Sequence, residues 1–531
     1  MAKYTILESL NDKVPLPSHF DANNFTLAAM DNFDNADRNS LSGTMHAHDT
    51  AMTLFQVKPI SHPEKPQKST FDLSNTPDLH ELPCQKIIPF HATHKLPLPE
   101  SFKVAKDLFV DHSFKDSFSK SEFVINATQS IATDSQEVFI PSWAGFQSLI
   151  SDKKLPKMHV GFVPFLPKPV TEYYTVYTAM KNFTHLAETL NQEALPLFCD
   201  EGVFRIVIDI YLNEPDQFST LIPMLGGFHA AKCLQHCIGK FIKGSGLEES
   251  LRQTRFFGIK IVDSVLEGSH YVRSLKGLLI LANAIEKLKW EAFIKTGRVE
   301  NTGVFDDHMK SLLAALETSK RKTCREKFRR CLDQSDFIHS EYQAFTKHCS
   351  NTSEIVQYLE ELLKLVRILK NLIYADREGS WTGHLQAVQD MLPVFIQAGS
   401  INYARYCSLY LEIIRKLQKD HPSIYKQFCE GNFVVKTSDG FFNAVSPDMK
   451  LEQSTQRSKK STGGIIGETK RQSFVTEWEM CYHEVLSISK LYSNLTKSCL
   501  AERESTTLNK ELRPHNVREY QHAVNEISRY L

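Results

Sequence analysis

Acidic residues stand at the ends of apolar runs, where carboxylates can gather at one edge of a sheet. Asp31 and Asp200 each directly follow such a run, and Asp34 lies shortly after Asp31. Glu452 follows Pro447–Asp448 in what should be the first turns of a helix. Three carboxylates from distant positions suit a pair of Mg²⁺ ions, which prefer oxygen ligands and can clamp a phosphodiester. Because the chain has 62 acidic residues and an Asp at a strand end commonly caps a helix, the spacing alone favours the structural role.

A second candidate set lies along one expected helix. It consists of His229, Cys233, His236 and Cys237, and the spacings of four and three put the first three on one helical face. Zinc could use such ligands, with a fourth from elsewhere in the chain. We favour a second interpretation, in which the helix is simply packed and carries small buried cysteines and one polar histidine. His229 could still lie near a site that binds phosphate.

Positive charge is concentrated in two stretches. Between Lys320 and Arg330 there are seven basic residues and one acid, Glu326, and the candidates for contact with nucleic acid are Lys320, Arg321 and Arg325. Between Arg457 and Arg471 there are five basic residues and one acid, with candidates Arg457, Lys459 and Lys460. A solvated helix face or a nuclear-import patch would explain the first stretch equally well.

The overall composition excludes several classes of protein. The 531 residues carry 62 basic and 62 acidic side chains, which excludes a histone-like basic protein, and 42% hydrophobic residues exclude a wholly disordered chain. The sequence has no GxxxxGK[ST], HExxH or GxSxG motif, no signal-peptide core and no apolar run long enough to span a membrane. The 11 cysteines include no CxxC pair. We therefore expect a nuclear or cytoplasmic protein that is not secreted and has no membrane partner.

Proline usage divides the chain into two parts. Fifteen of the 22 prolines lie within residues 1–170, and none lies between Met224 and Leu392. Since proline disrupts helices, the second stretch predicts a helical region, here assigned to residues 246–430. Residues 60–155 are expected to form an irregular excursion over the surface.

Short apolar runs predict strands that alternate with helices before residue 245. The expected strands are 25–30, 50–57, 160–166, 194–199 and 220–225, and the expected helices are 173–190, 203–212 and 230–242. This alternation indicates an α/β sheet.

Several short blocks, taken in order, resemble one family. They are Met30–Asp34 with Ser42–His46, Gly226–His229 with Ile238–Lys240, Asn402–Tyr406, and Leu451–Gln453 running through Ser461–Gly464 to Gly467. The ordered set, spread over residues 25–485, resembles a family of mostly uncharacterised, transposase-derived proteins from mobile elements in invertebrate genomes. Their layout is similar to that of hAT-type transposases, and Cys233–His236 resembles the CxxH element that follows the second acid in those enzymes.

The resemblance implies an α/β, RNase H-like mixed sheet interrupted by a large all-helical insertion. In DDE-type enzymes of this class, a first Asp lies on the first strand, a second follows the fourth strand, and a Glu lies on a late helix. Asp31 or Asp34, then Asp200 and Glu452, would fill those positions and hold Mg²⁺ or Mn²⁺, with His229 assisting beside the scissile phosphate.

The domain organisation follows from the same comparison. Residues 1–245 would form the first part of the core, 246–430 the insertion, 431–500 the last part of the core with the Glu helix, and 501–531 a C-terminal helical tail. No DNA-binding module is expected before the core, because the first candidate strand begins about 24 residues into the chain.

Two functions remain open. The first is Mg-dependent cleavage or transfer of DNA strands at element ends, with DNA as partner and a homo-oligomer as a further option. The second is a non-catalytic, host-retained protein that uses the same fold and its helical insertion to bind protein or nucleic acid.

Overall fold

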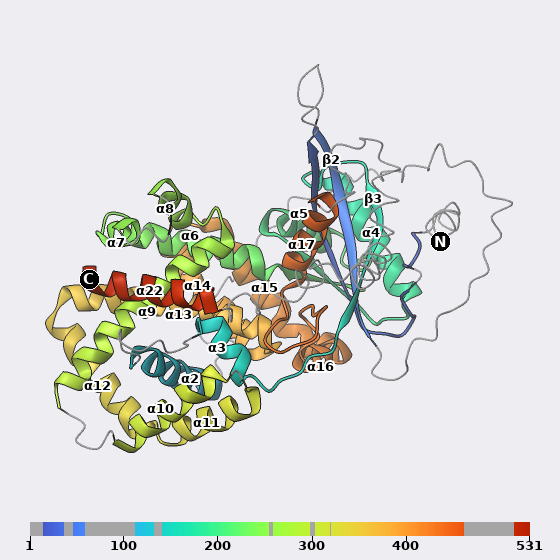
Figure 1. Ribbon diagram of the computed structural model, residues 1–531. Helices are drawn as coiled ribbons and strands as arrows, with labels where there is room; N and C mark the ends of the chain where they lie inside the picture. The colour runs from blue at the N-terminus through green and yellow to red at the C-terminus, as the bar shows by residue number, and fades with distance from the viewer. Residues whose placement is uncertain are drawn as a thin grey trace, which may run out of the picture.

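A mixed sheet forms one end of the molecule, and a body of helices forms the other (Figure 1). The computed structural model describes residues 14–17, 19–36, 46–58, 112–131, 141–253, 257, 259–297, 303–318, 320–460 and 514–531. The sheet has five strands in the order β3-β2-β1-β4-β5. They are β1 (Thr26–Ala36), β2 (His46–Val57), β3 (Met158–Leu166), β4 (Leu195–Cys199) and β5 (Leu221–Leu225).

The strands run in two senses. β2 is antiparallel to both β1 and β3, whereas β1, β4 and β5 are parallel to one another. All five residues of β4 and of β5 are buried, as expected for short parallel strands that are covered on both faces. The strands overlap the predicted apolar runs, so the α/β class is confirmed. The expected end of the first strand before Asp31 was wrong, because β1 continues through Asp31 and Asp34 in its pairing with β2.

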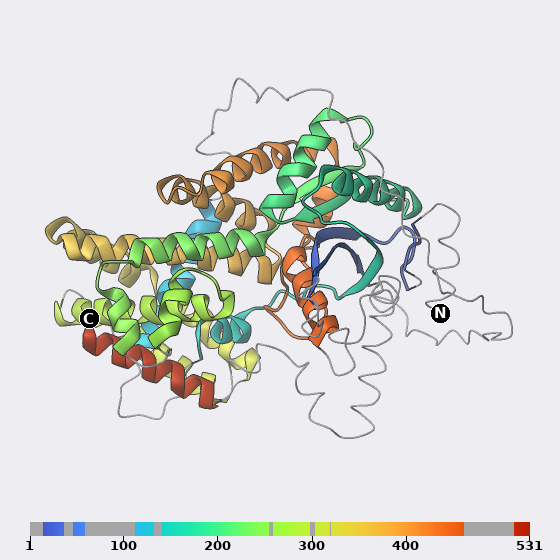
Figure 2. The same ribbon diagram turned by 90° about the horizontal axis from the view of Figure 1, so that it is seen from above.

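Helices from distant parts of the chain pack on the parallel part of the sheet. α4 (Tyr173–Thr189) and α5 (Glu201–Asn213) contact β4 and β5, and α17 (Pro447–Lys460) contacts β1, β4 and α6 (Gly227–Ile242). Figure 2 shows α17 lying against the sheet although it follows β5 by more than two hundred residues. The sheet edge and α17 therefore come together only in the folded chain.

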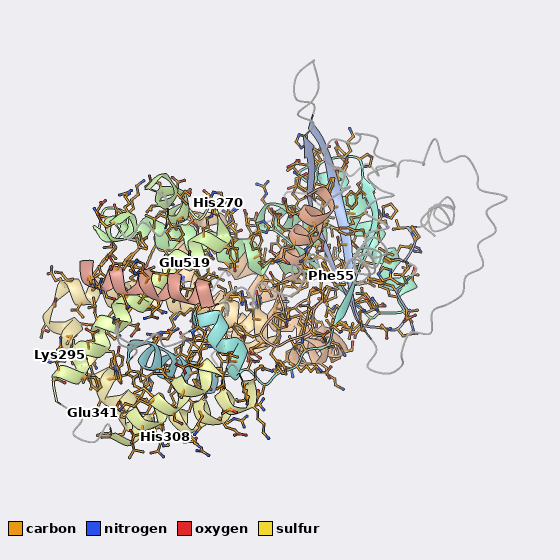
Figure 3. The ribbon with its side chains drawn as sticks, viewed as in Figure 1. Phe55, His270, Lys295, His308, Glu341 and Glu519 are labelled. Carbon is orange, nitrogen blue, oxygen red and sulfur yellow. The ribbon has the colours of Figure 1, made fainter. Side chains whose placement is uncertain are left out.

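The region 246–430 is helical, as predicted from the proline-free stretch that makes up most of it, and Pro393 lies inside a helix. Its helices are α7 (Leu247–Gln253), α8 (Ile259–Leu266), α9 (Tyr271–Lys295), α10 (Gly303–Glu317), α11 (Arg321–Asp333), α12 (Asp336–Thr352), α13 (Glu354–Glu378), α14 (Trp381–Gln397), α15 (Ile401–Asp420) and α16 (Pro422–Cys429). In Figure 3 the labelled Lys295, His308 and Glu341 lie in this body, at the opposite end from Phe55 of β2.

Two segments outside 246–430 also belong to the helical body. The segment expected to be irregular contains α2 (His112–Ser130) and α3 (Trp143–Ile150), which pack on α9 and α11. The expected C-terminal tail, residues 501–531, contains the helix α22 (Pro514–Tyr530), which packs on α9 and buries Tyr520, Val524 and Ile527. The irregular interpretation was wrong for α2 and α3 because proline content describes the loops around a helix and not the helix itself.

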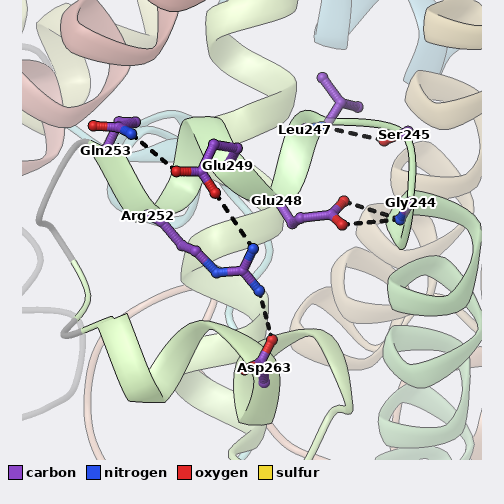
Figure 4. Close-up of polar contacts among 8 residues, drawn as sticks. All are labelled: Gly244, Ser245, Leu247, Glu248, Glu249, Arg252, Gln253 and Asp263. Carbon is purple, nitrogen blue, oxygen red and sulfur yellow. Dashed lines mark hydrogen bonds and ion pairs between the residues drawn. The ribbon is translucent and has the colours of Figure 1, made fainter.

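Polar contacts fix the turn at which the chain enters the helical region (Figure 4). The carboxylate of Glu248 accepts from the backbone N–H of Gly244 at 2.9 Å, where a positive φ suits glycine. Arg252 donates to Asp263 at 2.7 Å and to Glu249 at 3.4 Å, which joins α7 to α8. None of the described helices is long and apolar enough to cross a membrane.

Candidate functional site

Two of the predicted acids lie level with each other on neighbouring parallel strands. The register pairs Ala28 with Leu197 and Ala29 with Phe198, so Asp31 on β1 stands beside Asp200, the first residue after β4. Asp200 is the N-cap of α5, and its Oδ1 accepts from the backbone N–H of Val203 at 2.8 Å. The cap holds the Asp200 carboxylate at the end of the sheet.

Asp31 lies in an environment that disfavours its negative charge. Burial, the charge of Asp200 and, to a smaller extent, the charge of Glu452 raise the pKa of Asp31 to about 7, against the opposing charge of His229 and a hydrogen bond from the Asn32 backbone. Carboxyl groups from the end of β4 and from α17 therefore lie close enough to Asp31 on β1 to raise its pKa. The sequence predicted these three acids as metal ligands, and that role stays a prediction.

His229 carries the positive charge of the site. Its Nδ1 lies 3.2 Å from Oδ2 of Asp448, and its side chain is 22% exposed. Burial lowers the pKa of His229, but the hydrogen bond and charge of Asp448, with the charges of Asp31 and Asp200, outweigh it and raise the value to about 9. The imidazole is therefore a cation at neutral pH.

Asp448 is the site residue that sequence reasoning missed. Its Oδ2 accepts from the backbone N–H groups of Phe228 at 3.1 Å and His229 at 3.2 Å, and so caps α6 from a different helix. A Cβ on Gly226 would lie 2.3 Å from the same oxygen, so only glycine allows this close approach. Burial alone would raise the pKa of Asp448, but the contacts with His229 hold it below its usual range.

Glu452 lies one helical turn beyond Asp448 on α17. Residues four apart share a helix face, so the capping contact of Asp448 also fixes the side of α17 on which Glu452 stands. Glu452 is half-buried. The spacing of two acids four apart after a proline was the available sequence signal for Asp448, but nothing local indicated its partner on α6.

A second carboxylate–histidine pair lies on α13 and α14, which pack against α6. Asp376 on α13 is 2.9 Å from Nδ1 of His384 on α14, and the Tyr410 hydroxyl on α15 lies 3.4 Å from Nε2 of His384. A Cβ on Gly227 would approach Oδ2 of Asp376 to 2.8 Å. Burial raises the pKa of Asp376, with His384 opposing and Asp448 adding to the rise. The helical body thus contributes directly to the support of the α6 N-terminus.

The oxygen donors at the site are of the type that hard divalent cations prefer as ligands. Asp31, Asp200 and Glu452 offer carboxylate oxygens, and the raised pKa of Asp31 marks a concentration of negative charge that a cation would relieve. In the part of the chain that the structure describes, His, Cys, Asp and Glu side chains form no ready-made group of three or more metal ligands.

Asp34 and the cysteine set lie apart from this cluster. Asp34 is on the opposite face of β1 from Asp31, is exposed, and contacts Nδ1 of His48 on β2 at 2.5 Å. Cys237 Sγ packs 3.4 Å from the Ser400 hydroxyl, and His236 Nδ1 contacts the carbonyl oxygen of Glu267 at 3.1 Å. The favoured interpretation of a packed helix therefore agrees with the contacts of α6, and Asp31 is the acid that the structure brings to Asp200.

The basic residues divide between exposed and structural positions. Arg321 donates to the carbonyl oxygens of Ser148 and Ser151, and its guanidinium stacks 3.3 Å from the centroid of Phe441. Lys320 and Arg457 are exposed, and Arg325 is half-buried. α11, which carries Arg321 and Arg325, lies at the edge of the helical body away from the sheet (Figure 1). The side chains of Lys459 and Lys460, and all residues from 461 to 513, lie outside the described residues.

Comparison with protein families gives one match. The model of a domain of unknown function, DUF8702, matches residues 142–531. The chain belongs to the DUF8702 family. The DUF8702 match includes Asp200, His229, Asp448 and Glu452, whereas Asp31 precedes it. Comparisons with curated proteins and with solved structures found no match.

Proposed function

We propose that the protein is a transposase-derived DNA-handling protein with an RNase H-like core that cleaves or transfers DNA strands with the help of Mg²⁺ or Mn²⁺. The observation that carries the proposal is the strand register that places Asp31 beside Asp200. Burial and the charges of Asp200 and Glu452 raise the pKa of Asp31, which supports it. A buried cluster of interacting carboxyl groups from separate elements is typical of functional sites.

The order of the elements supports the same proposal. Asp31 lies on β1, Asp200 directly follows β4, and Glu452 lies on α17 after the helices α7 to α16. The resemblance to DDE-type enzymes predicted this order, with a helical insertion between the second and third acids.

Each residue has a role that follows from its surroundings. Asp31, Asp200 and Glu452 would hold the divalent cation, which when bound supplies charge stabilisation and an activated oxygen nucleophile. His229, kept cationic by Asp448, would stabilise negative charge on a phosphate oxygen. Asp448 and Gly226 act as positioning residues because they hold His229 and the N-terminus of α6 in place.

The proposed partner is DNA, contacted through basic side chains. Arg457 is exposed near the end of α17, on the same helix as Glu452. A contact between Arg457 and a DNA phosphate would place the DNA backbone beside the acidic residues. Lys320 and Arg325 on α11 would contact a second stretch of backbone or a second molecule. A nuclear location and a homo-oligomer belong to this proposal.

Cleavage of labelled duplex oligonucleotides tests the proposal. The full chain is incubated with DNA and Mg²⁺ or Mn²⁺, and strand cleavage or transfer is measured for the parent protein, Asp200→Asn and Asp34→Asn. Asparagine at 200 keeps an oxygen to cap α5, so the fold is retained while the charge is lost. We expect activity in the parent protein and in Asp34→Asn and its loss in Asp200→Asn. Equal cleavage by the parent protein and Asp200→Asn would contradict the proposal.

A non-catalytic binding protein is the second candidate. It is favoured by the structural contacts of two of the acids, since Asp200 caps α5 and Asp448 caps α6. DNA or protein binding that needs no divalent cation and is unchanged in Asp200→Asn, with no cleavage, would establish this alternative.

A further inference from the structure

A cavity of about 230 Å³ lies among the helices, away from the acidic site. Its walls come from α2, α9, α12 and α13. This region is marked in Figure 3 by Glu341 on α12 and Lys295 at the end of α9, at the opposite end of the molecule from the sheet. The volume is sufficient for a ligand with one aromatic ring and its substituents, since a cavity of about 150 Å³ holds benzene.

One wall of the cavity is aromatic. The rings of Phe123, Trp290 and Tyr342 pack against one another, with centroids 5.3 Å apart for Phe123 and Tyr342 and 5.8 Å apart for Trp290 and each of the other two. These three residues are buried, so their rotamers are held by packing. They form a rigid apolar wall against which the edge or face of a ring can pack.

The acids in the cavity wall already have partners. Glu286 accepts from the Tyr342 hydroxyl at 2.9 Å, and Glu360 accepts from Lys289 at 2.8 Å. Glu122 accepts from Lys370 at 2.9 Å and from the Trp143 indole at 2.6 Å. The acidic side chains that line the cavity therefore present little unpaired negative charge to a ligand.

Two cations in the wall remain available to a ligand. Arg367 and Lys347 line the cavity, both are exposed, and no ion pair joins either of them to another described residue. Burial alone would raise the pKa of Glu286, but the charges of Lys289 and Arg367 outweigh it and lower the value, so Arg367 lies close to the buried acid of the wall. The cavity therefore favours an anionic group near Arg367.

Two buried polar atoms in the wall have no hydrogen-bond partner within the described part of the chain. They are Oδ1 of Asn126 and Oγ1 of Thr346. Buried polar atoms are almost always paired, and Asn126 Oδ1 can only accept. A bound molecule that donates a hydrogen bond would satisfy it.

From the aromatic wall, the available cations and the unpaired acceptor, we infer that this cavity binds a small aromatic acid that also carries a hydroxyl or amino group. The ring packs against the wall of Phe123, Trp290 and Tyr342, the acid group pairs with Arg367, and the donor group reaches Asn126 Oδ1. This site is separate from the acidic cluster, and it is independent of the proposed activity there.

Calorimetric titration of the full chain tests the inference with three probes. 4-Hydroxybenzoate has the ring, the acid and the donor, benzoate lacks the donor, and 4-hydroxybenzyl alcohol lacks the charge. We expect saturable binding of 4-hydroxybenzoate with a Kd below about 1 mM and binding weaker by about tenfold for each of the other two.

Two variants locate the binding. Arg367→Gln should weaken binding of 4-hydroxybenzoate by about tenfold, whereas Lys364→Gln, an exposed substitution on the same helix, should leave it unchanged. In Asn126→Leu, 4-hydroxybenzoate and benzoate should bind alike. The inference is overturned if no probe binds saturably at millimolar concentration, or if binding is the same in Arg367→Gln as in the parent chain.

Discussion

Replacing Asp31 by asparagine should stabilise the protein, and the gain should depend on pH. The folded chain keeps the Asp31 proton up to a pKa of about 7, whereas the unfolded chain releases it near 3.8. A carboxyl group whose pKa is raised by folding contributes stability below its unfolded pKa and loses that contribution as the pH rises through the folded pKa. Asparagine has the same shape and no such titration.

The size of the effect follows from these two values. Stability falls by about 1.4 kcal/mol for each pH unit between them, which reaches about 4 kcal/mol above neutral pH. From about pH 5 to about pH 8, the parent protein should therefore lose about 3 kcal/mol relative to Asp31→Asn. Asp34→Asn is the matched control, because Asp34 is exposed on the other face of the same strand.

Urea denaturation at the two pH values measures the free energies of unfolding of all three proteins. Addition of Mg²⁺ extends the test, because a cation held by Asp31 would favour the ionised carboxyl group. The pH dependence of the parent protein should then decrease, while that of Asp31→Asn stays the same. A difference between the parent protein and Asp31→Asn that is the same at both pH values would refute the account of Asp31 as a buried, charge-crowded carboxyl group.

The remaining predictions concern the supports of the site and of the helical body. Gly226→Ala places a Cβ 2.3 Å from Asp448 and should lower the free energy of unfolding by about 1–3 kcal/mol, measured by urea denaturation. Asp448→Asn should lower the pKa of His229 from about 9 toward its ordinary value; an NMR titration of the imidazole that still gives about 9 would contradict the pairing. Glu122→Gln should destabilise the protein by about 3–5 kcal/mol, because it leaves the buried ammonium of Lys370 without its counter-charge, and Lys370→Met made in the same chain should restore much of the loss on thermal denaturation.

The sequence predicted the elements that are defined by local pattern. β4 is a short apolar run that ends just before Asp200, the residue that caps α5. β5 is a short apolar run that ends just before Gly226, where the side chain of Asp448 approaches the backbone closely. α2 was missed because serine, which favours caps and turns, recurs along it and prolines precede it. Its burial depends on α9, which is far away in the chain.

The site could be predicted only in part for a similar reason. The choice between Asp31 and Asp34 depends on which face of β1 is covered by α17, and this cannot be determined from two acids three residues apart. Asp448 has no local sign of its function, because its partners are backbone groups of Phe228 and His229. Such contacts depend on the register between distant segments.

The capping of α6 by Asp448 has a consequence for synthesis of the chain. The two contacting groups are 220 residues apart, and Glu452 follows Asp448. At about 5–20 residues per second, a ribosome makes α6 tens of seconds before the residue that caps it. During that interval His229 lacks its counter-ion and the third acid does not yet exist. A nascent chain therefore cannot assemble the acidic site until almost all of the helical body has been made.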